Sequence, residues 1–278
     1  MSDQSYYAYD GFMTVSQYKM FRDCPACAMA TINGEWVRPK TEALLVGSYV
    51  DSILTDSPEE HVRFMEENHK RLFKRNGEPY AFLAKADDAV ARVKRQPLAM
   101  KYLDGEHQTI MYGAIEGVPF KIKMDTYRPG EFISDLKYLA SLRSPNLFES
   151  PIKYWGYDIQ AACYQEIVRQ NTGEKLPFFF VIATKEDPCK VRVAQISQAD
   201  MDEALEEVKK NIGYYSDIKE GKIPAEHCEQ CDYCTETMIQ EEVIDVNEIG
   251  MNRKQREYQK RYAVTEDKGI YGKENIYA

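Results

Sequence analysis

The chain has 278 residues, of which 44% are hydrophobic and 29% are charged, and its net charge is −9. This length allows one large domain or two modest ones, because domains typically contain about 100–200 residues. The sequence lacks both a continuous apolar run long enough to span a membrane and the blocks of a signal peptide, so we predict a cytosolic protein. The acidic balance argues against nucleic acid as a partner without excluding it, because an enzyme can confine its positive charge to a groove.

The first part of the chain is predicted to be mainly helical. Ser16 is expected to cap a short helix that ends near Cys24. Ser57 and Pro58 are expected to open a later helix, because a capping serine, a proline and early acids favour a helix start. Two more segments show helical patterning, namely residues 43–54 and 83–95.

The middle of the chain changes to strand patterning, with turns near Glu116-Gly117 and Pro129-Gly130. Four elements are expected after this meander, namely a helix over 152–170, a buried strand over 178–184, an alternating strand over 190–196 and an amphipathic helix after 197. This order predicts an α/β or α+β fold with a central mixed β-sheet flanked by helices. The expected parts are an N-terminal segment, 1–13, one domain, 14–235, and a polar C-terminal tail or oligomerisation arm, 236–278.

The hairpin predicted around Pro129-Gly130 carries the most informative pattern. Asp135 and Lys137 must share a face of the second strand, because strand side chains alternate. Asp125 joins them only if the loop has an odd number of residues, since a two-residue turn would pair Asp125 with Ser134. Pro-Gly favours a longer loop, and two carboxylates beside an ammonium can hold Mg²⁺ next to a water. The alternative interpretation is a surface hairpin with scattered charges.

Two pairs of residues lie at helical spacing on either side of this hairpin. Asp51, four residues after Gly47, would be costly to bury unpaired in an apolar helix and is a third candidate carboxylate. Gly47 itself predicts a packing or approach reason, because glycine weakens a helix by about 1 kcal/mol relative to alanine. Gln160 and Tyr164 share a helix face and can hydrogen-bond a phosphate or a metal-bound water. Separately, each pair also fits an ordinary helix.

Together, G-x-x-x-D, D-x₉-D-x-K and Q-x-x-x-Y resemble the PD-(D/E)XK nuclease family in its RecB-like and phage exonuclease branch, with RecE-type exodeoxyribonuclease VIII as the most similar type. The segment from Ser16 to Pro25 is similar to the start of RecB-type nuclease domains. Residues 179–188 are similar to the strand and turn after the core helix of RecE-like exonucleases. The resemblance covers about residues 14–235 and departs from the family at Asp51, where the first motif usually has His.

The resemblance implies a restriction-endonuclease-like core and metal-dependent hydrolysis of DNA. The implied ligands of Mg²⁺ or Mn²⁺ are Asp51, Asp125, Asp135 and the backbone carbonyl of Leu136. The implied catalytic residues are Asp125, Asp135, Lys137, Gln160 and Tyr164. The metal would polarise the phosphate and lower the pKa of a bound water, and Lys137 would orient that water or stabilise the developing charge.

Five of the seven cysteines form two clusters, Cys24-Pro-Ala-Cys27 and Cys228-Glu-Gln-Cys231-Asp-Tyr-Cys234. A cytosolic location argues against disulfides, and the second cluster has the spacing of a metal site. Cys24, Cys27 or His227 could supply a fourth ligand. Some RecB-like nucleases of the AddB and CRISPR-associated types are similar and bind a 4Fe–4S cluster, although the last spacing is shorter here. Zinc and free thiols are the alternatives, while Cys163 and Cys189 are expected to be plain buried residues.

The resemblance also implies a biological activity. It implies an exonuclease that degrades linear double-stranded DNA from 5′ to 3′ in phage- or prophage-type recombination. Such an enzyme would form a ring-like homo-oligomer and pass single strands to a single-strand annealing protein. The alternatives are a RecB-like repair or CRISPR-associated nuclease of different polarity, and a catalytically silent DNA-binding or metal-stapled module.

Overall fold

The structure, a computed structural model, describes residues 11–39, 41–145, 149–239, 243–251 and 256. The chain forms two compact units, of which the first contains Met1–Lys19 and Arg38–Asp217 and the second contains Met20–Val37 and Ile218–Ala278. The boundaries predicted at residues 13 and 235 stay a prediction, and most of the predicted C-terminal tail lies outside the described residues. Within the described ranges, no helix is long and apolar enough to cross a membrane.

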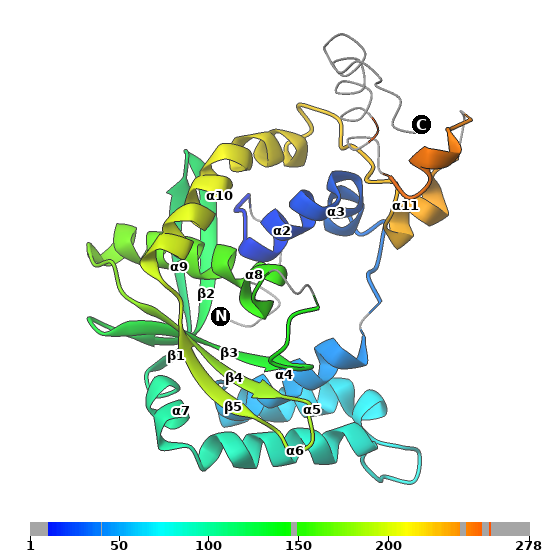
Figure 1. The fold of residues 1–278 in the computed structure, drawn as a ribbon. Helices are drawn as coiled ribbons and strands as arrows, with labels where there is room; N and C mark the ends of the chain where they lie inside the picture. The colour runs from blue at the N-terminus through cyan, green and yellow to red at the C-terminus, as the bar shows by residue number, and fades with distance from the viewer. Residues whose placement is uncertain (1–10, 40, 146–148, 240–242, 252–255, 257–278) are drawn as a thin grey trace, which may run out of the picture. The chain divides into compact units, whose positions relative to one another are not determined.

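The first unit is built on a five-stranded mixed sheet (Figure 1). Its strands, in spatial as well as chain order, are β1 Glu106–Ile115, β2 Val118–Arg128, β3 Phe132–Leu139, β4 Phe178–Thr184 and β5 Val191–Gln195. Strands β3 and β4 are parallel, whereas the other neighbouring pairs are antiparallel. The mixed sheet and its flanking helices confirm the predicted α+β class.

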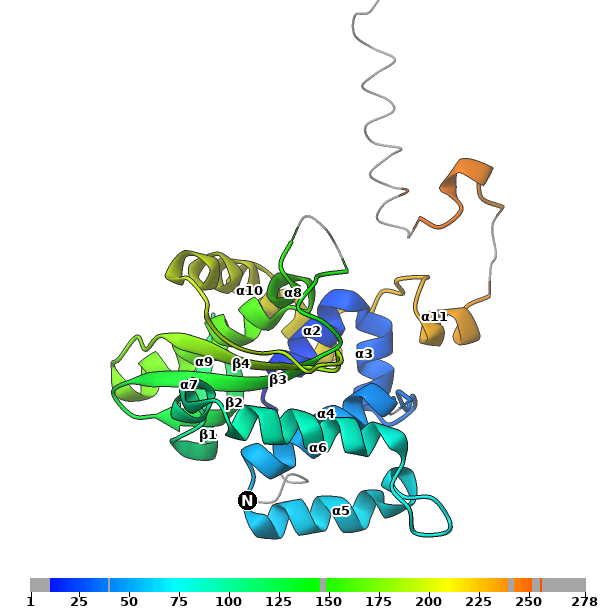
Figure 2. The same cartoon turned by 60° about the horizontal axis from the view of Figure 1, so that its bottom comes forward.

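Helices cover both faces of this sheet (Figures 1 and 2). On one side lie α4 Glu42–Leu54, α5 Pro58–Leu72, α6 Ala81–Lys94 and α7 Pro97–Tyr102, and on the other lie α8 Pro151–Tyr154, α9 Tyr157–Thr172 and α10 Gln198–Lys219. Helices α4, α6 and α7 share an apolar core with Leu136 of β3 and Val181 of β4. Helix α9 packs closely on β1 at Gly113, where a Cβ atom would lie 2.9 Å from Ile167 Cδ1. These packings fix the strands that carry the candidate site.

Helix ends follow local side-chain chemistry. Ser57 and Glu60 form a reciprocal capping box at the start of α5, as predicted. The predicted cap at Ser16 is wrong, because α2, Val15–Asp23, begins one residue earlier and the Gln17 N–H donates to Thr14 Oγ1 at 3.2 Å. The helix expected over 152–170 is interrupted at Gly156, whose φ of 62° lies in the left-handed region and separates α8 from α9.

The second unit contains the two cysteine-bearing segments. Its described helices are α3 Pro25–Ile32, α11 Asp232–Thr237 and the 3₁₀ helix η1 Val246–Glu248. The Ala26 N–H donates to the Glu226 carbonyl at 3.0 Å, which joins the start of α3 to the segment before α11. Trp36 packs edge-on against Tyr233, with 5.5 Å between ring centroids. Residues about two hundred positions apart in the chain therefore form one small core.

Candidate functional site

The β2–β3 hairpin has the odd loop length that convergence of its carboxylates requires. Thr126 pairs with Ser134 and Arg128 pairs with Phe132, so the loop between them contains three residues. Extending this register by one residue places Asp125 opposite Asp135. The carboxylate of Asp125 accepts a hydrogen bond from the Leu136 N–H at 3.0 Å. The hairpin therefore brings the two predicted carboxylates to one place, as the sequence predicts.

Asp135 is the most enclosed member of the site, with only 1% of its surface exposed. Its Oδ1 accepts a hydrogen bond from Gln160 Nε2 of α9 at 2.5 Å. Its Oδ2 forms an ion pair with the Lys137 ammonium, but no donor of hydrogen-bonding geometry reaches this buried oxygen from the described residues. The sheet and α9 thus hold the carboxylate while one of its oxygens keeps an unfilled acceptor position.

Asp51 is positioned from the last turn of α4. Thr55 Oγ1 donates to Asp51 Oδ1 at 2.7 Å, and Gln108 Nε2 donates to Thr55 Oγ1 at 3.0 Å. Gln108 has a left-handed φ of 53° and lies opposite Asp125, at the one position where the β1–β2 pairing is interrupted. At this gap, His107 Nδ1 lies 3.1 Å from the carbonyl oxygen of Asp125 and donates to it. The sequence gives no signal for the hydrogen bonds that link Gln108 through Thr55 to Asp51, because strand patterning does not indicate a local backbone reversal.

Burial and mutual repulsion disfavour the ionised forms of two carboxyl groups of the site. Burial raises the pKa of Asp51 to about 7 against the opposing hydrogen bond from Thr55, and Asp135 adds to the rise. Burial also raises the pKa of Asp125 well above its ordinary value, and the charges of Asp135 and Asp51 reinforce the shift. For Lys137, burial acts to lower the pKa, but Asp135 and Asp125 outweigh it and the pKa is raised.

This donor set fits a hard divalent cation. Asp135 forms an ion pair with the Lys137 ammonium, and the raised pKa values of Asp51 and Asp125 arise in part from repulsion by the neighbouring carboxylates, which a bound cation would relieve. Carboxylate and carbonyl oxygens are the ligands that Mg²⁺ and Mn²⁺ prefer, and the buried Asp135 oxygen has acceptor capacity left.

The two predicted residues of α9, Gln160 and Tyr164, contact different groups of the site. Gln160 contacts Asp135, whereas the Tyr164 hydroxyl donates to the Lys123 carbonyl of β2 at 2.7 Å, two residues before Asp125. Of the two reasons predicted for Gly47, packing is wrong for the described residues, because a Cβ atom there would meet nothing within 4 Å, and close approach stays a prediction.

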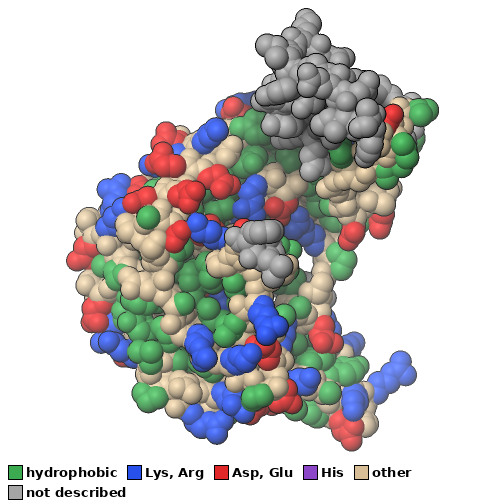
Figure 3. Space-filling view, viewed as in Figure 1, with side chains coloured by type: hydrophobic (Ala, Val, Ile, Leu, Met, Phe, Trp, Pro, Cys, Tyr) green, Lys and Arg blue, Asp and Glu red, His purple; other side chains and the backbone are tan. Residues whose placement is uncertain are grey.

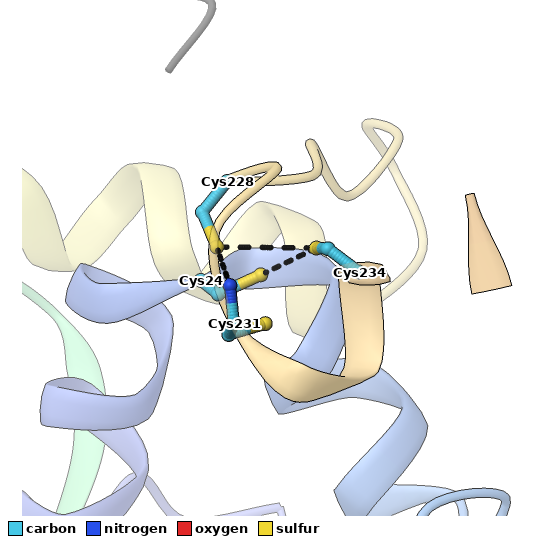
Figure 4. Close-up of side chains that lie close together, drawn as sticks. All are labelled: Cys24, Cys228, Cys231 and Cys234. Carbon is cyan, nitrogen blue, oxygen red and sulfur yellow. Dashed lines mark hydrogen bonds between the residues drawn. The ribbon is translucent and has the colours of Figure 1, made fainter. Parts of the chain in front are cut away.

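Four cysteines form a second candidate site, in the second unit (Figure 4). The sulfur atoms of Cys24, Cys228, Cys231 and Cys234 all lie within 4.8 Å of one another. Cys27 is outside this group, and its backbone N–H donates to Cys24 Sγ at 3.4 Å. Of the three candidates for a fourth ligand, the structure therefore places Cys24 with the C-terminal trio. His227 Nδ1 lies 3.3 Å from Cys234 Sγ, at the edge of the group.

The backbone around Cys228 favours a thiolate. Burial alone would raise the pKa of this thiol, but the N–H groups of Gln230 and Cys231, 3.5 and 3.4 Å from its sulfur, lower it. Four cysteine sulfurs at this separation fit either zinc or an iron–sulfur cluster. The other two cysteines, Cys163 and Cys189, are buried away from these clusters, as predicted.

Comparison with known proteins identifies the family of this chain. Residues 14–237 match the family model described as "PDDEXK-like domain of unknown function (DUF3799)", and this range contains every residue of both candidate sites. A solved structure from Eubacterium rectale, provisionally named an exonuclease, is 38% identical, with a TM-score of 0.83 over 90% of this chain and 98% of that one. No curated protein matches. The chain therefore belongs to this PDDEXK-like family.

Proposed function

We propose that the protein is a metal-dependent exonuclease that hydrolyses phosphodiester bonds of linear double-stranded DNA. The observation that carries this proposal is the three-residue hairpin loop, because it sets Asp125 opposite Asp135 while Lys137 forms an ion pair with Asp135. Membership of a PDDEXK-like family and the name of the Eubacterium rectale neighbour support a nuclease.

The metal would be held by oxygen atoms of the first unit. The proposed ligands are Asp51, Asp125, Asp135 and the Leu136 carbonyl, and the proposed ion is Mg²⁺ or Mn²⁺. Once bound, such an ion supplies a polarised phosphate and a water of lowered pKa. Metal would also relieve the repulsion that raises the pKa values of Asp51 and Asp125.

Lys137 acts in this proposal as a cation and not as a base. Its raised pKa keeps the ammonium protonated at neutral pH, so it can donate to the attacking water or to a phosphate oxygen but cannot accept a proton. Asp135 and the ring of Tyr157, whose centroid is 4.5 Å from Nζ, fix its position. Gln160 holds the Asp135 carboxylate, and Tyr164 holds β2 beside Asp125.

Surface charge restricts where DNA can approach. On the face drawn in Figure 3, acidic side chains gather along α10. The acidic residues of the α10 sequence are Asp200, Asp202, Glu203, Glu206, Glu207 and Asp217. Because these acids repel phosphates, we expect the DNA backbone to lie closer to the Lys137 ammonium of the candidate metal site than to α10.

The motif resemblance supports a more specific activity. It supports 5′ to 3′ degradation of linear duplex in phage- or prophage-type recombination by a ring-like homo-oligomer in the cytosol. The partner would be a single-strand annealing protein. A second candidate, a RecB-like repair or CRISPR-associated nuclease of other polarity, is favoured by one observation: an N-terminal cysteine, Cys24, joins a C-terminal trio.

We further propose that the four-cysteine group binds a structural 4Fe–4S cluster or Zn²⁺. Four converging sulfurs, without a disulfide among the described cysteines, support a bound metal. Anaerobically purified protein that absorbs at about 400 nm and contains iron would identify a 4Fe–4S cluster. Colourless protein containing zinc would identify Zn²⁺, and protein without metal would contradict the proposal.

Three DNA substrates test the proposed activity. These are a linear duplex labelled at its 5′ ends, the same duplex labelled at its 3′ ends, and a closed circle. With Mg²⁺, we expect early release of the 5′ label as short products and an intact circle, whereas chelator stops all cleavage. Early release of the 3′ label indicates the second candidate. Cleavage of the circle contradicts an exonuclease, and binding without cleavage indicates a silent module.

A further inference from the structure

The corner between α8 and α9 presents two aromatic side chains to solvent. Trp155 is 49% exposed and Tyr154 is 39% exposed, and their rings meet edge to face with 4.8 Å between centroids. Gly156 turns the chain here with its left-handed φ, which a residue with a side chain adopts only under strain. The backbone itself thus fixes the corner that carries the two rings.

This corner is connected to the candidate metal site through Tyr157. The Lys19 ammonium donates to the Trp155 carbonyl at 2.6 Å and lies 5.1 Å from the centroid of the Tyr157 ring. The Lys137 ammonium lies 4.5 Å from the same centroid. Two cations, one of them in the proposed catalytic centre, therefore lie near the ring that follows Trp155 by two residues.

Lys153 also lies at this corner and offsets the negative charge of two acids of α10. Lys153 forms ion pairs with Asp200 at 2.7 Å and with Glu203 at 3.4 Å. The Lys19 ammonium lies beside Trp155, because it donates to the Trp155 carbonyl. An aromatic surface beside a cation matches the two chemical features of a DNA strand, its base faces and its phosphates.

We propose that Trp155, with Tyr154 beside it, is a stacking platform for an unpaired nucleobase of the DNA strand held in the site, and that Lys19 contacts an adjoining phosphate. This inference rests on the proposed function and specifies its substrate. A base inside a duplex already stacks on both faces, so only an unpaired base offers a free face to Trp155. The platform thus favours an opened or overhanging strand end over an intact interior, which agrees with an enzyme that acts at ends.

Tryptophan fluorescence can report this contact directly. The chain contains two tryptophans, so Trp36→Phe leaves Trp155 as the only one. Fluorescein-labelled duplexes with a short single-stranded end would be titrated into this full-length variant with Ca²⁺ in place of Mg²⁺. Binding would be followed by anisotropy and stacking by tryptophan quenching. We expect both signals to change together, and quenching to disappear when the unpaired nucleotides are abasic.

Substitutions make the test specific. Trp155→Ala should weaken binding of the overhanging duplex by about tenfold, the usual scale for one base–aromatic stack, and leave binding of the abasic duplex unchanged. Trp155→Phe should restore most of the affinity. Tyr80→Ala, at an aromatic residue that is also 39% exposed but lies before α6, is the matched control and should have no effect. Circular dichroism would check that each variant is folded.

The outcomes separate the platform from the nuclease. If Trp155→Ala binds every duplex as tightly as the wild type, or if DNA binds without quenching, the platform is refuted. If cleavage persists in that case, the proposed function stands without it. If the wild type neither binds nor cleaves DNA, the proposed function fails and the platform fails with it.

Discussion

Replacing Asp51 by Asn should stabilise the metal-free protein, and the gain should depend on pH. Burial and neighbouring acids raise the pKa of Asp51 from 3.8 to about 7. The native state therefore binds a proton more tightly than the unfolded chain, so the free energy of unfolding falls as pH rises between these two values. At about 1.36 kcal/mol per pKa unit, the ionised carboxylate costs about 4 kcal/mol above pH 7.

Asn cannot ionise, yet its side-chain oxygen can still accept the hydrogen bond from Thr55. The stability gained by Asp51→Asn should therefore be larger at pH 8 than at pH 5 by about 3 kcal/mol. For a chain of this size, 1 kcal/mol corresponds to about 2–4 °C in Tm. The gain in Tm should consequently differ by roughly 5–10 °C between the two pH values.

Thermal and urea unfolding with chelator would measure both gains, and Asp88→Asn, at an exposed aspartate of α6, is the matched control. Adding Mg²⁺ should then stabilise the wild type more than Asp51→Asn, because ligand that binds only the native state raises stability. An equal gain at pH 5 and pH 8 would refute the electrostatic reasoning. Equal stabilisation of both proteins by Mg²⁺ would refute the role of Asp51 as a ligand.

Three further changes test other parts of the site. Thr55→Val should weaken Mn²⁺ binding by about 10- to 100-fold in calorimetry, whereas Thr55→Ser, which keeps the hydroxyl, should bind normally. Deleting Ser134 from β3, with the three-residue loop kept, should shift Asp135 by one position against Asp125 and send the two carboxylates to opposite faces, so cleavage and Mn²⁺ binding should both be lost; retention of either contradicts the register argument. Cys24→Ser should lower the metal content of the second unit, whereas Cys27→Ser should not, and equal loss in both would contradict the four-cysteine assignment.

The central hairpin could be predicted from sequence because strand geometry leaves few alternatives. Side chains alternate strictly, so a one-residue change in the loop would reverse the face of Asp125. Pro129-Gly130 argued for a longer loop, and the structure has three loop residues. The positions of the later strands along the chain could also be predicted, because an alternating run and a short continuous apolar run are both typical of strands.

Contacts between segments distant in sequence, and local backbone reversals, could not be predicted. Spacing alone left Cys24, Cys27 and His227 open as the fourth member of the cysteine group, and only packing of the two segments places Cys24 there. The backbone reversal at Gln108 has no sequence signal, since glutamine rarely adopts a positive φ. The break at Gly156 was missed because a glycine within an apolar pattern does not distinguish a tolerated helix residue from a corner.

The most direct test of the nuclease assignment is a Mg²⁺ titration of linear-duplex digestion by the wild type and by Asp135→Asn. Asn at this position keeps an oxygen for the Gln160 hydrogen bond but loses the charge that pairs with Lys137 and would bind the metal. We expect Mg²⁺-dependent release of nucleotides by the wild type and about a hundred- to thousandfold slower release by the variant, the usual scale for loss of one essential electrostatic group. Equal digestion by both proteins, or digestion by the wild type without any divalent metal, would contradict the assignment.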